Sequence, residues 1–260
     1  MTTNIVIGAA SGMGAAVARR MASRGERLIL ADIAVDRVHD LARTLEAEVE
    51  VLRCDVSSRE DLEAVADAAG SVGAVIVTAG ISPTMAGGRR IYEVDLVGPA
   101  HFVQAFEPYV GPGSVAVLFA SMAAHMVPPM AEFDAVLDRP LDDDFFDALA
   151  GLGLDIDHSD SAYAFAKRGV LRLVRREAGR WGAKGARLVS LSPGIVETPM
   201  GMQEASQQPA MAEMVTRSAL GRMLTADEVA VVADFLASAA ASGITGTDVL
   251  VDGGAVASST

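Results

Sequence analysis

Residues 4–20 read NIVIGAASGMGAAVARR, an apolar run that stops at Gly8 and passes through Gly12 and Gly14 into a helix-favouring segment. Glycines permit a tight turn and let backbone N–H groups approach a pyrophosphate at the positive end of the following helix. The G-x-x-x-G-x-G pattern therefore predicts a dinucleotide site, with an ordinary strand-to-helix turn as the alternative. A P-loop is excluded because no Gly-Lys-Ser/Thr ending follows.

Beyond this stretch, short apolar strands alternate with segments of helical periodicity. The alternation predicts one α/β domain over residues 1–260, with a parallel seven-stranded, doubly wound sheet and helices on both faces. The predicted strands are Asn4–Ile7, Arg27–Ala31, Glu50–Arg53, Ala74–Thr78, Ser114–Phe119, Arg187–Leu191 and Asp248–Val251. The predicted helices are Gly12–Arg24, Val35–Glu46, Ser58–Ala68, Ile91–Phe106, Ser161–Trp181 and Ala226–Ala240. The alternation breaks down in an insertion at about residues 127–160.

Composition narrows the class of protein. Apolar residues make up 51% of the 260 residues, which suits a buried parallel sheet. A formal net charge of −13 argues against a nucleic-acid partner, and no apolar stretch approaches the roughly 18 residues that a membrane span needs. The single cysteine, Cys54, and a start that lacks signal-peptide features predict a cytoplasmic protein.

Two carboxylates follow predicted strands. Asp32 ends the second strand, eighteen positions beyond Gly14, where it can accept hydrogen bonds from ribose hydroxyls and repel a 2′-phosphate. This placement favours NAD over NADP, and the alternative is that Asp32 only caps the next helix. Asp55 follows the third strand, where it can reach the adenine or cap the helix that starts at Ser58.

Tyr163 and Lys167 are four residues apart on a predicted helix, so their side chains should share one face. An ammonium near a phenol favours the phenolate and lowers the phenol pKa. The pair therefore predicts a tyrosine that acts as a general acid or base, with Lys167 lowering its pKa.

The insertion holds much of the acidity. Residues 126–160 contain ten acids and one arginine, which accounts for −9 of the net charge of −13. Its apolar residues, Phe133, Val136, Leu137, Phe145, Phe146 and Leu149, predict two short amphipathic helices with acidic outer faces. These helices either pack on the domain or shape the substrate entrance or a subunit contact.

These motifs together resemble the classical short-chain dehydrogenase/reductase family over nearly the full length. The glycine turn and the Tyr163–Lys167 pair are similar to the family's two signatures. Further matches are Thr78-Ala79-Gly80 after the fourth strand, Ser121 after the fifth, Ser192–Met200 with its Pro-Gly loop and downstream threonine, and Ile244–Gly254 at the last strand. The long separation of Ser121 from Tyr163 resembles the branch of bacterial 3α-hydroxysteroid dehydrogenase/carbonyl reductase.

The resemblance implies a Rossmann-type fold and assigns roles to residues. It implies that Ser121 orients a substrate oxygen and that Tyr163, Lys167 and Asp95 complete the catalytic group. It implies that NAD, with NADP less expected, is held by Gly8, Ser11, Gly12, Met13, Gly14, Asp32, Ile33, Asp55, Val56, Ala79, Gly80, Tyr163, Lys167, Pro193, Gly194, Val196 and Thr198.

Asp95 departs from the family, which has asparagine at this helical position. The backbone carbonyl of Asp95 can still serve a proton relay, but an ionised aspartate donates no hydrogen bond. We therefore expect the distortion of this helix and the efficiency of the relay to be affected.

The predicted function is an NAD-dependent oxidoreductase that acts on a neutral, hydrophobic secondary alcohol or ketone of the hydroxysteroid or carbonyl type. An acidic rim and nearby methionines favour such a substrate. The predicted assembly, from the resemblance, is a homodimer or homotetramer. The alternative function is an NAD(H)-binding sensor with little turnover. No metal site is expected, because His125 and His158 lack partners at metal-ligand spacing and are interpreted as surface residues.

Overall fold

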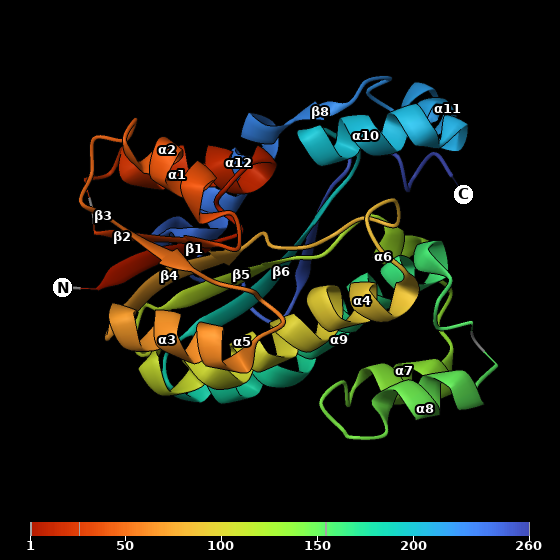
Figure 1. Cartoon of the computed structure of the whole chain (residues 1–260), viewed down its shortest axis with the longest axis horizontal. Coiled ribbons are helices and arrows are strands. Elements are labelled where there is room, and N and C mark those ends of the chain that lie inside the picture. The colour runs from red at the N-terminus through yellow and green to blue at the C-terminus, as the bar shows by residue number, and fades with distance from the viewer. Residues whose placement is uncertain (1, 26, 154, 260) are drawn as a thin grey trace.

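The centre of the computed structural model, which describes residues 2–25, 27–153 and 155–259, is a seven-stranded sheet (Figure 1). The strand order is β3-β2-β1-β4-β5-β6-β9, and every neighbouring pair is parallel. The strands are β1 (Thr3–Ile7), β2 (Leu28–Asp32), β3 (Val49–Arg53), β4 (Val72–Val77), β5 (Val115–Phe119), β6 (Arg187–Pro193) and β9 (Asp248–Val251). Each predicted strand begins and ends within two residues of its observed counterpart, so the predicted fold class is confirmed.

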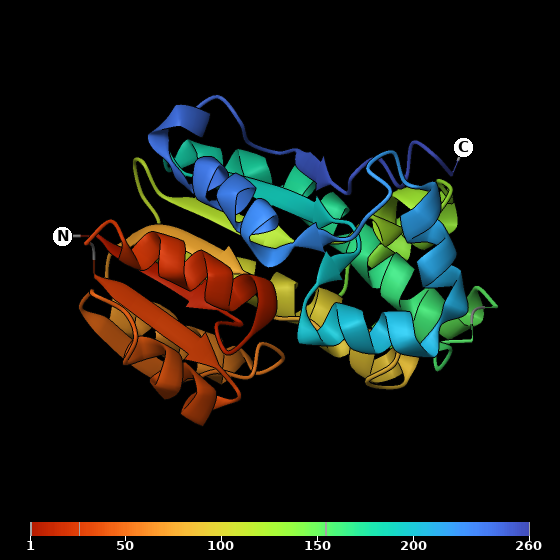
Figure 2. The same ribbon diagram turned by 90° about the horizontal axis from the view of Figure 1, so that it is seen from above.

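Helices cover both faces of the sheet (Figures 1 and 2). One face carries α1 (Gly12–Ala22), α2 (Val35–Ala42) and α12 (Ala226–Ala237), and the other carries α3 (Arg59–Ala69), α5 (Gly98–Phe106) and α9 (Ser159–Ala183). The alternation of side chains along each strand produces the two layers. In β1, for example, Ile5 and Ile7 join the core under α3, α5 and α9, whereas Val6 joins the core under α1 and α12.

The helix predicted at Ile91–Phe106 has three parts. It begins with α4 (Gly88–Tyr92), opens into a π-helical turn η1 (Glu93–Val97), and continues as α5. Within the turn, the Gly98 N–H donates to the carbonyl of Glu93, five residues earlier. Pro99, next along the chain, has no N–H to donate to the carbonyl of Asp95. The helix distortion therefore forms with aspartate at position 95, contrary to our expectation.

The insertion forms the two predicted amphipathic helices, α7 (Ala131–Leu137) and α8 (Phe145–Gly151). Phe133, Leu137, Phe145 and Leu149 are buried in a core with α4 and α9, so the insertion packs on the domain. The prediction of purely acidic outer faces is wrong for Asp134. Its carboxylate is buried and accepts two hydrogen bonds of 2.7 Å from Arg168 on α9.

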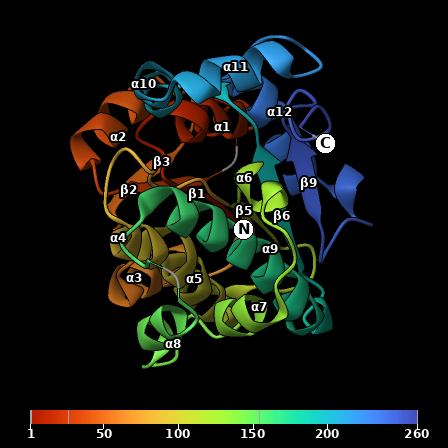
Figure 3. The same ribbon diagram turned by 90° about the vertical axis from the view of Figure 1, so that its right-hand side faces the viewer.

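Two helices beyond β6 were not predicted, α10 (Pro199–Gln207) and α11 (Pro209–Arg217). Each begins with a proline, a residue that suits the first helical turn. Figure 3 shows them at one side of the sheet, with α7 and α8 at the opposite side. A short parallel pair, β7 (Val196–Glu197) and β8 (Leu224–Thr225), joins this region to α12.

The remaining short elements are η2 (Glu107–Tyr109), α6 (Ala123–Met126) and η3 (Ala239–Ala241). Among the helices that the structure describes, none has the length and apolar character needed to cross a bilayer.

Candidate active site

The carboxyl ends of β1 and β4 form the point where the strand order reverses, and a crevice opens there. Gly8 has a φ of +94°, and a Cβ on it would lie 2.4 Å from the Ala79 nitrogen. A Cβ on Gly14 would lie 1.9 Å from the Gly8 carbonyl oxygen. Thr78 closes this junction, because its hydroxyl donates to the carbonyls of Ile7 and Gly8 at 3.1 and 3.0 Å. Only glycine fits at positions 8 and 14.

The crevice suits the phosphates of a dinucleotide. Helix α1 starts at Gly12 with its positive end toward the crevice, and the Ser11 side chain makes no capping hydrogen bond there. The cavity has a volume of about 330 Å³. Because Gly12 and Gly14 in the first turn of α1 carry no side chain, a pyrophosphate can approach the backbone N–H groups there closely. These residues therefore fit a dinucleotide cofactor.

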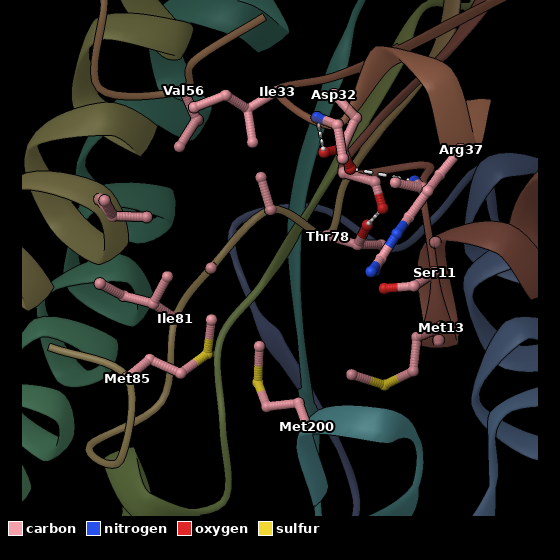
Figure 4. Close-up of a pocket in the computed structure, with 18 of the residues that line it drawn as sticks. Ser11, Met13, Asp32, Ile33, Arg37, Val56, Thr78, Ile81, Met85 and Met200 are labelled. Atoms are coloured by element: carbon pink, nitrogen blue, oxygen red, sulfur yellow. Dashed lines mark hydrogen bonds between the residues drawn. The ribbon is translucent and has the colours of Figure 1, made fainter. Parts of the chain in front are cut away.

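Asp32 lies at the edge of this cavity, where Figure 4 shows it near Ser11 and Arg37. Its carboxylate accepts hydrogen bonds from the N–H groups of Ala10, at 3.0 Å, and Ala34, at 2.9 Å. Ala34 itself is the N-cap residue of α2, so Asp32 is not that helix's cap residue. Its carboxylate joins the glycine turn to the loop after β2 and remains at the cavity wall.

A second set of side chains, from the loops after β2 and β3, also lines the crevice. Asp55 and Val56 follow β3, and Ile33, with 58% of its surface exposed, presents an apolar side chain (Figure 4). Ser58 is the N-cap of α3, so capping does not occupy Asp55. Burial acts to raise the pKa of Asp55, but hydrogen bonds with Ser57 and the charge of Arg90 outweigh burial and lower that pKa.

The predicted catalytic residues meet where β5 approaches α9. Ser121 follows β5, is 8% exposed, and forms a hydrogen bond with Tyr163. The Lys167 ammonium lies 5.7 Å from the centre of the Tyr163 ring and donates to the Phe119 carbonyl at 3.3 Å. The helical spacing of Tyr163 and Lys167 thus brings them to one face, as predicted from the sequence.

Asp95 reaches the same place from η1. Its side chain is fully buried, and one carboxylate oxygen lies 3.5 Å from the Lys167 ammonium while accepting from the Ile81 N–H at 3.1 Å. Burial raises the pKa of Asp95, and the Lys167 charge opposes that rise.

One sequence expectation for this group is wrong. Burial raises the pKa of the Tyr163 phenol above its usual value, Asp95 and Glu204 raise it further, and only the hydrogen bond with Ser121 opposes them. The expected lowering of the Tyr163 pKa by Lys167 does not prevail, because burial raises that pKa and the Asp95 carboxylate, 3.5 Å from the Lys167 ammonium, adds to the rise.

A second cavity, of about 250 Å³, lies beside Tyr163 and Ser121. Its walls include Pro193, Gly194 and Val196 from the end of β6 and the loop beyond it, and the methionines Met13, Met122, Met126, Met200, Met211 and Met214. Met13, Thr198 and Met200 line both cavities, so the two adjoin. The carboxylates of Asp160 and Glu204 also line the second cavity, and burial raises the pKa of Glu204.

His125 and His158 are exposed, as expected from the sequence, and each also makes hydrogen bonds. His125 lies 2.8 Å from a carboxylate oxygen of Asp248 and 3.3 Å from the Ser192 hydroxyl, which ties α6 to β6 and β9. His158 accepts from the Ser161 N–H and caps α9. Within the described residues, no three histidine, cysteine or acidic side chains gather as a metal site would require.

Most of the predicted cofactor residues line one of the two cavities. The first cavity contains twelve of the predicted cofactor residues, namely Gly8, Ser11, Gly12, Met13, Gly14, Asp32, Ile33, Asp55, Val56, Ala79, Gly80 and Thr198. The second contains Tyr163, Pro193, Gly194 and Val196, while Lys167 lies behind them. Three further residues line the cavities but were not predicted from the sequence: Arg37, Arg90 and Glu204. Arg37 follows Asp32 closely enough to have been considered, whereas only the fold brings Arg90 and Glu204 to the cavities.

The comparisons with known proteins identify the class that this site defines. A family model described as Enoyl-(Acyl carrier protein) reductase matches residues 8–136 and 152–256. The short-chain dehydrogenase/reductase bsc3 of Alternaria brassicicola is 30% identical, covering 98% of this chain and 96% of its own length. The chain therefore belongs to the short-chain dehydrogenase/reductase family, whose members are oxidoreductases with a nicotinamide cofactor.

Two further relatives carry more specific names. Cis-4-hydroxycyclohexanecarboxylate dehydrogenase of Sinomonas cyclohexanicum is 32% identical, covering 96% of this chain and 94% of its own length. The crystal structure of the 3-alpha-hydroxysteroid dehydrogenase from Pseudomonas sp. B-0831 complexed with NADH has a TM-score of 0.78. The two sequences are 28% identical, and the match covers 97% of this chain and 96% of the Pseudomonas chain.

We expect Gly14→Ala to weaken NADH binding by more than about tenfold, or roughly 1.4 kcal/mol, and to lower the melting temperature. The reason is that the new methyl group would force α1 away from the Gly8 carbonyl. Fluorescence titration with NADH and thermal unfolding measure the two effects.

Gly182→Ala is the matched control, because Gly182 is exposed near the end of α9 and a Cβ added there would meet nothing within 4 Å. It should leave both properties unchanged or raise stability slightly, since alanine favours a helix. Normal NADH affinity in Gly14→Ala would contradict the close-approach explanation.

Proposed function

We propose that the protein transfers a hydride between NAD(H) and a neutral, hydrophobic secondary alcohol or ketone, with Tyr163 as the general acid or base. The observation that carries this proposal is that Ser121 and Tyr163 line the second cavity, which adjoins the first, while the Lys167 ammonium lies 5.7 Å from the centre of the Tyr163 ring. A bound nicotinamide supplies or accepts the hydride. The other steps belong to the chain's own residues.

In this proposal different side chains orient the substrate and transfer the proton. Ser121 donates to the substrate oxygen and fixes its position beside Tyr163. During reduction the Tyr163 hydroxyl donates its proton to that oxygen, and during oxidation the phenolate removes it. In this proposal Lys167, which contacts the Phe119 carbonyl and Asp95, binds the ribose of the cofactor.

We expect Tyr163→Phe to lower kcat by about 10²- to 10⁴-fold, the usual contribution of a general acid or base, and to leave NADH affinity within a few-fold. Absorbance of NADH during turnover of a ketone panel gives the rates. Tyr109→Phe is the control, because Tyr109 bonds Asp67 away from both cavities. Near-normal turnover by Tyr163→Phe would refute the role of the phenol, and a ketone panel without turnover by the unaltered protein would favour a sensor.

The preference for NAD over NADP rests on Asp32. Its carboxylate is fixed at the cavity wall by two backbone N–H groups, so a 2′-phosphate would meet a negative charge that cannot turn away. The solved relative with NADH supports the same preference. Arg37, which lines the same cavity, is the residue that would assist a 2′-phosphate once the carboxylate is neutral.

Asp32→Asn should therefore lower the KM for NADP relative to that for NAD by about tenfold, or roughly 1.4 kcal/mol. Steady-state kinetics with both cofactors measures the ratio. Asp36→Asn, at an exposed position on α2, is the control and should change neither KM. If Asp32→Asn leaves the ratio of the two KM values unchanged, Asp32 does not select the cofactor and serves only as a hydrogen-bond acceptor for the backbone.

The proposed substrate class follows from the second cavity. Flexible thioethers adapt to bulky apolar ligands, and the solved 3-alpha-hydroxysteroid dehydrogenase is consistent with such a ligand. The carboxylates of Glu204 and Asp160 line the same cavity and disfavour an anionic group. The name of the Sinomonas relative supplies the competing class, an alicyclic alcohol that bears a carboxylate.

Glu204→Gln should raise kcat/KM for 4-oxocyclohexanecarboxylate by about tenfold relative to cyclohexanone, because one repulsive charge is removed. The measurement covers a range of pH, because burial raises the pKa of Glu204 and the effect should grow as the pH rises. Glu213→Gln, an exposed change on α11, is the control. Preferential turnover of the carboxylated ketone by the unaltered protein would overturn the proposed substrate class.

We also propose a homodimer or homotetramer and a cytoplasmic location. The family resemblance supports the assembly, and the single, buried cysteine Cys54 fits a reducing compartment. Light scattering of the purified protein tests the assembly.

A further inference from the structure

Asp95 occupies an unusual place for an acidic side chain. It is fully buried, and one of its carboxylate oxygens has no hydrogen-bond partner among the described residues. The other oxygen accepts from the Ile81 N–H and faces the Lys167 ammonium at 3.5 Å. A buried carboxylate is costly unless it is paired, so its partner Lys167 explains how the charge is tolerated.

The pair lies directly against the cofactor crevice. A Cβ on Gly80 would meet the Asp95 carboxylate at 2.9 Å and the Lys167 ammonium at 3.1 Å. Gly80 in turn lines the first cavity. Asp95 is thus separated from the proposed reaction centre by one backbone turn, and water does not screen its charge.

Three charged groups act on Tyr163 from the elements packed around it. Lys167 lies one turn further along α9, Asp95 comes from η1, and Glu204 comes from α10. Ser121, after β5, contributes a neutral hydroxyl. Asp160, three residues before Tyr163 on α9, lines the second cavity together with it. The carboxylates of Asp95 and Glu204 act on the phenol, and the Lys167 ammonium is paired with Asp95 at 3.5 Å. These charges therefore give the ionised form of Tyr163 little net electrostatic stabilisation.

We propose that Asp95 is a positioning residue that sets the working pH of the site. By opposing the charge of Lys167 it keeps Tyr163 protonated at neutral pH, where the site is poised to donate a proton to a carbonyl. Alcohol oxidation needs the phenolate and becomes fast only in alkaline solution. This role rests on the proposed function of Tyr163 as the proton donor.

The sign of the pH dependence follows from the pairing of Asp95 with Lys167 at 3.5 Å and from the burial of Tyr163, which raises the pKa of its phenol. Below that pKa the phenol is protonated and serves reduction, and above it the phenolate serves oxidation. Loss of the Asp95 charge stabilises the phenolate, because the Lys167 ammonium then acts unopposed. Both pH profiles should consequently move toward lower pH.

The experiment compares Asp95→Asn with the unaltered protein in both directions of the reaction, over a range of pH. Asparagine has the shape of aspartate and retains an acceptor for the Ile81 N–H. We expect the alkaline onset of alcohol oxidation, and the alkaline loss of ketone reduction, to shift down by about one pH unit or more. NADH affinity should stay within a few-fold.

Asp134→Asn is the matched control. Asp134 is also a buried aspartate paired with a cation of α9, but its partner is Arg168 and it lies outside both cavities. It should lower thermal stability and leave both pH profiles in place. If Asp95→Asn does not fold, Asp95→Ser offers the same loss of charge with a smaller side chain.

The unaltered protein provides a test that needs no variant. Its alcohol oxidation should begin close to or above the ordinary tyrosine pKa of about 10, and an onset near neutrality would overturn the role of Asp95. A folded Asp95→Asn or Asp95→Ser protein with unchanged profiles would overturn it as well. Normal turnover by Tyr163→Phe would instead refute the proposed function itself, so the two failures are distinguishable.

Discussion

The structure depends on the contact between two backbone turns, one after β1 and one after β4. Gly8 and Gly14 permit this contact because any side chain there would collide with backbone atoms, and Thr78 closes it with two hydrogen bonds. The strand order reverses at the same point, so the turns diverge and leave a crevice. The start of α1, the Asp32 carboxylate and the Asp95–Lys167 pair all take their positions from that junction.

The two adjoining cavities are lined by different kinds of side chain. The glycine turn and the charged residues Asp32, Arg37, Asp55 and Arg90 line the first cavity, and six methionines line the second. Ser121 and Tyr163 line the second cavity, so a polar oxygen of an otherwise apolar substrate would have to lie beside them there. Helix α9 is held firmly for this task, because Arg168 and Arg172 on its other side bind Asp134 and Asp138 of the insertion at 2.6 to 3.0 Å.

The sequence was most informative where local rules decide the structure. Strand alternation and glycine spacing predicted the sheet and the crevice, and helical spacing placed Tyr163 beside Lys167. It failed where distant segments meet. The raised pKa of Tyr163 depends on its burial and on Asp95 and Glu204, which come from other elements. Helices α10 and α11 were missed although each begins with a proline and α11 is amphipathic, so for α11 a local signal was present and not used.

The thioether lining also exposes the protein to chemical change. Met126 and Met202 have 45% and 55% of their surface exposed, and Met126 lies in the wall of the substrate cavity. Peroxide converts an accessible methionine to its sulfoxide, a polar and chiral group that reductases can reverse. A wall suited to hydrocarbon would then display strong hydrogen-bond acceptors. Oxidative stress would thus alter which molecules enter the cavity before it damages the sheet beneath.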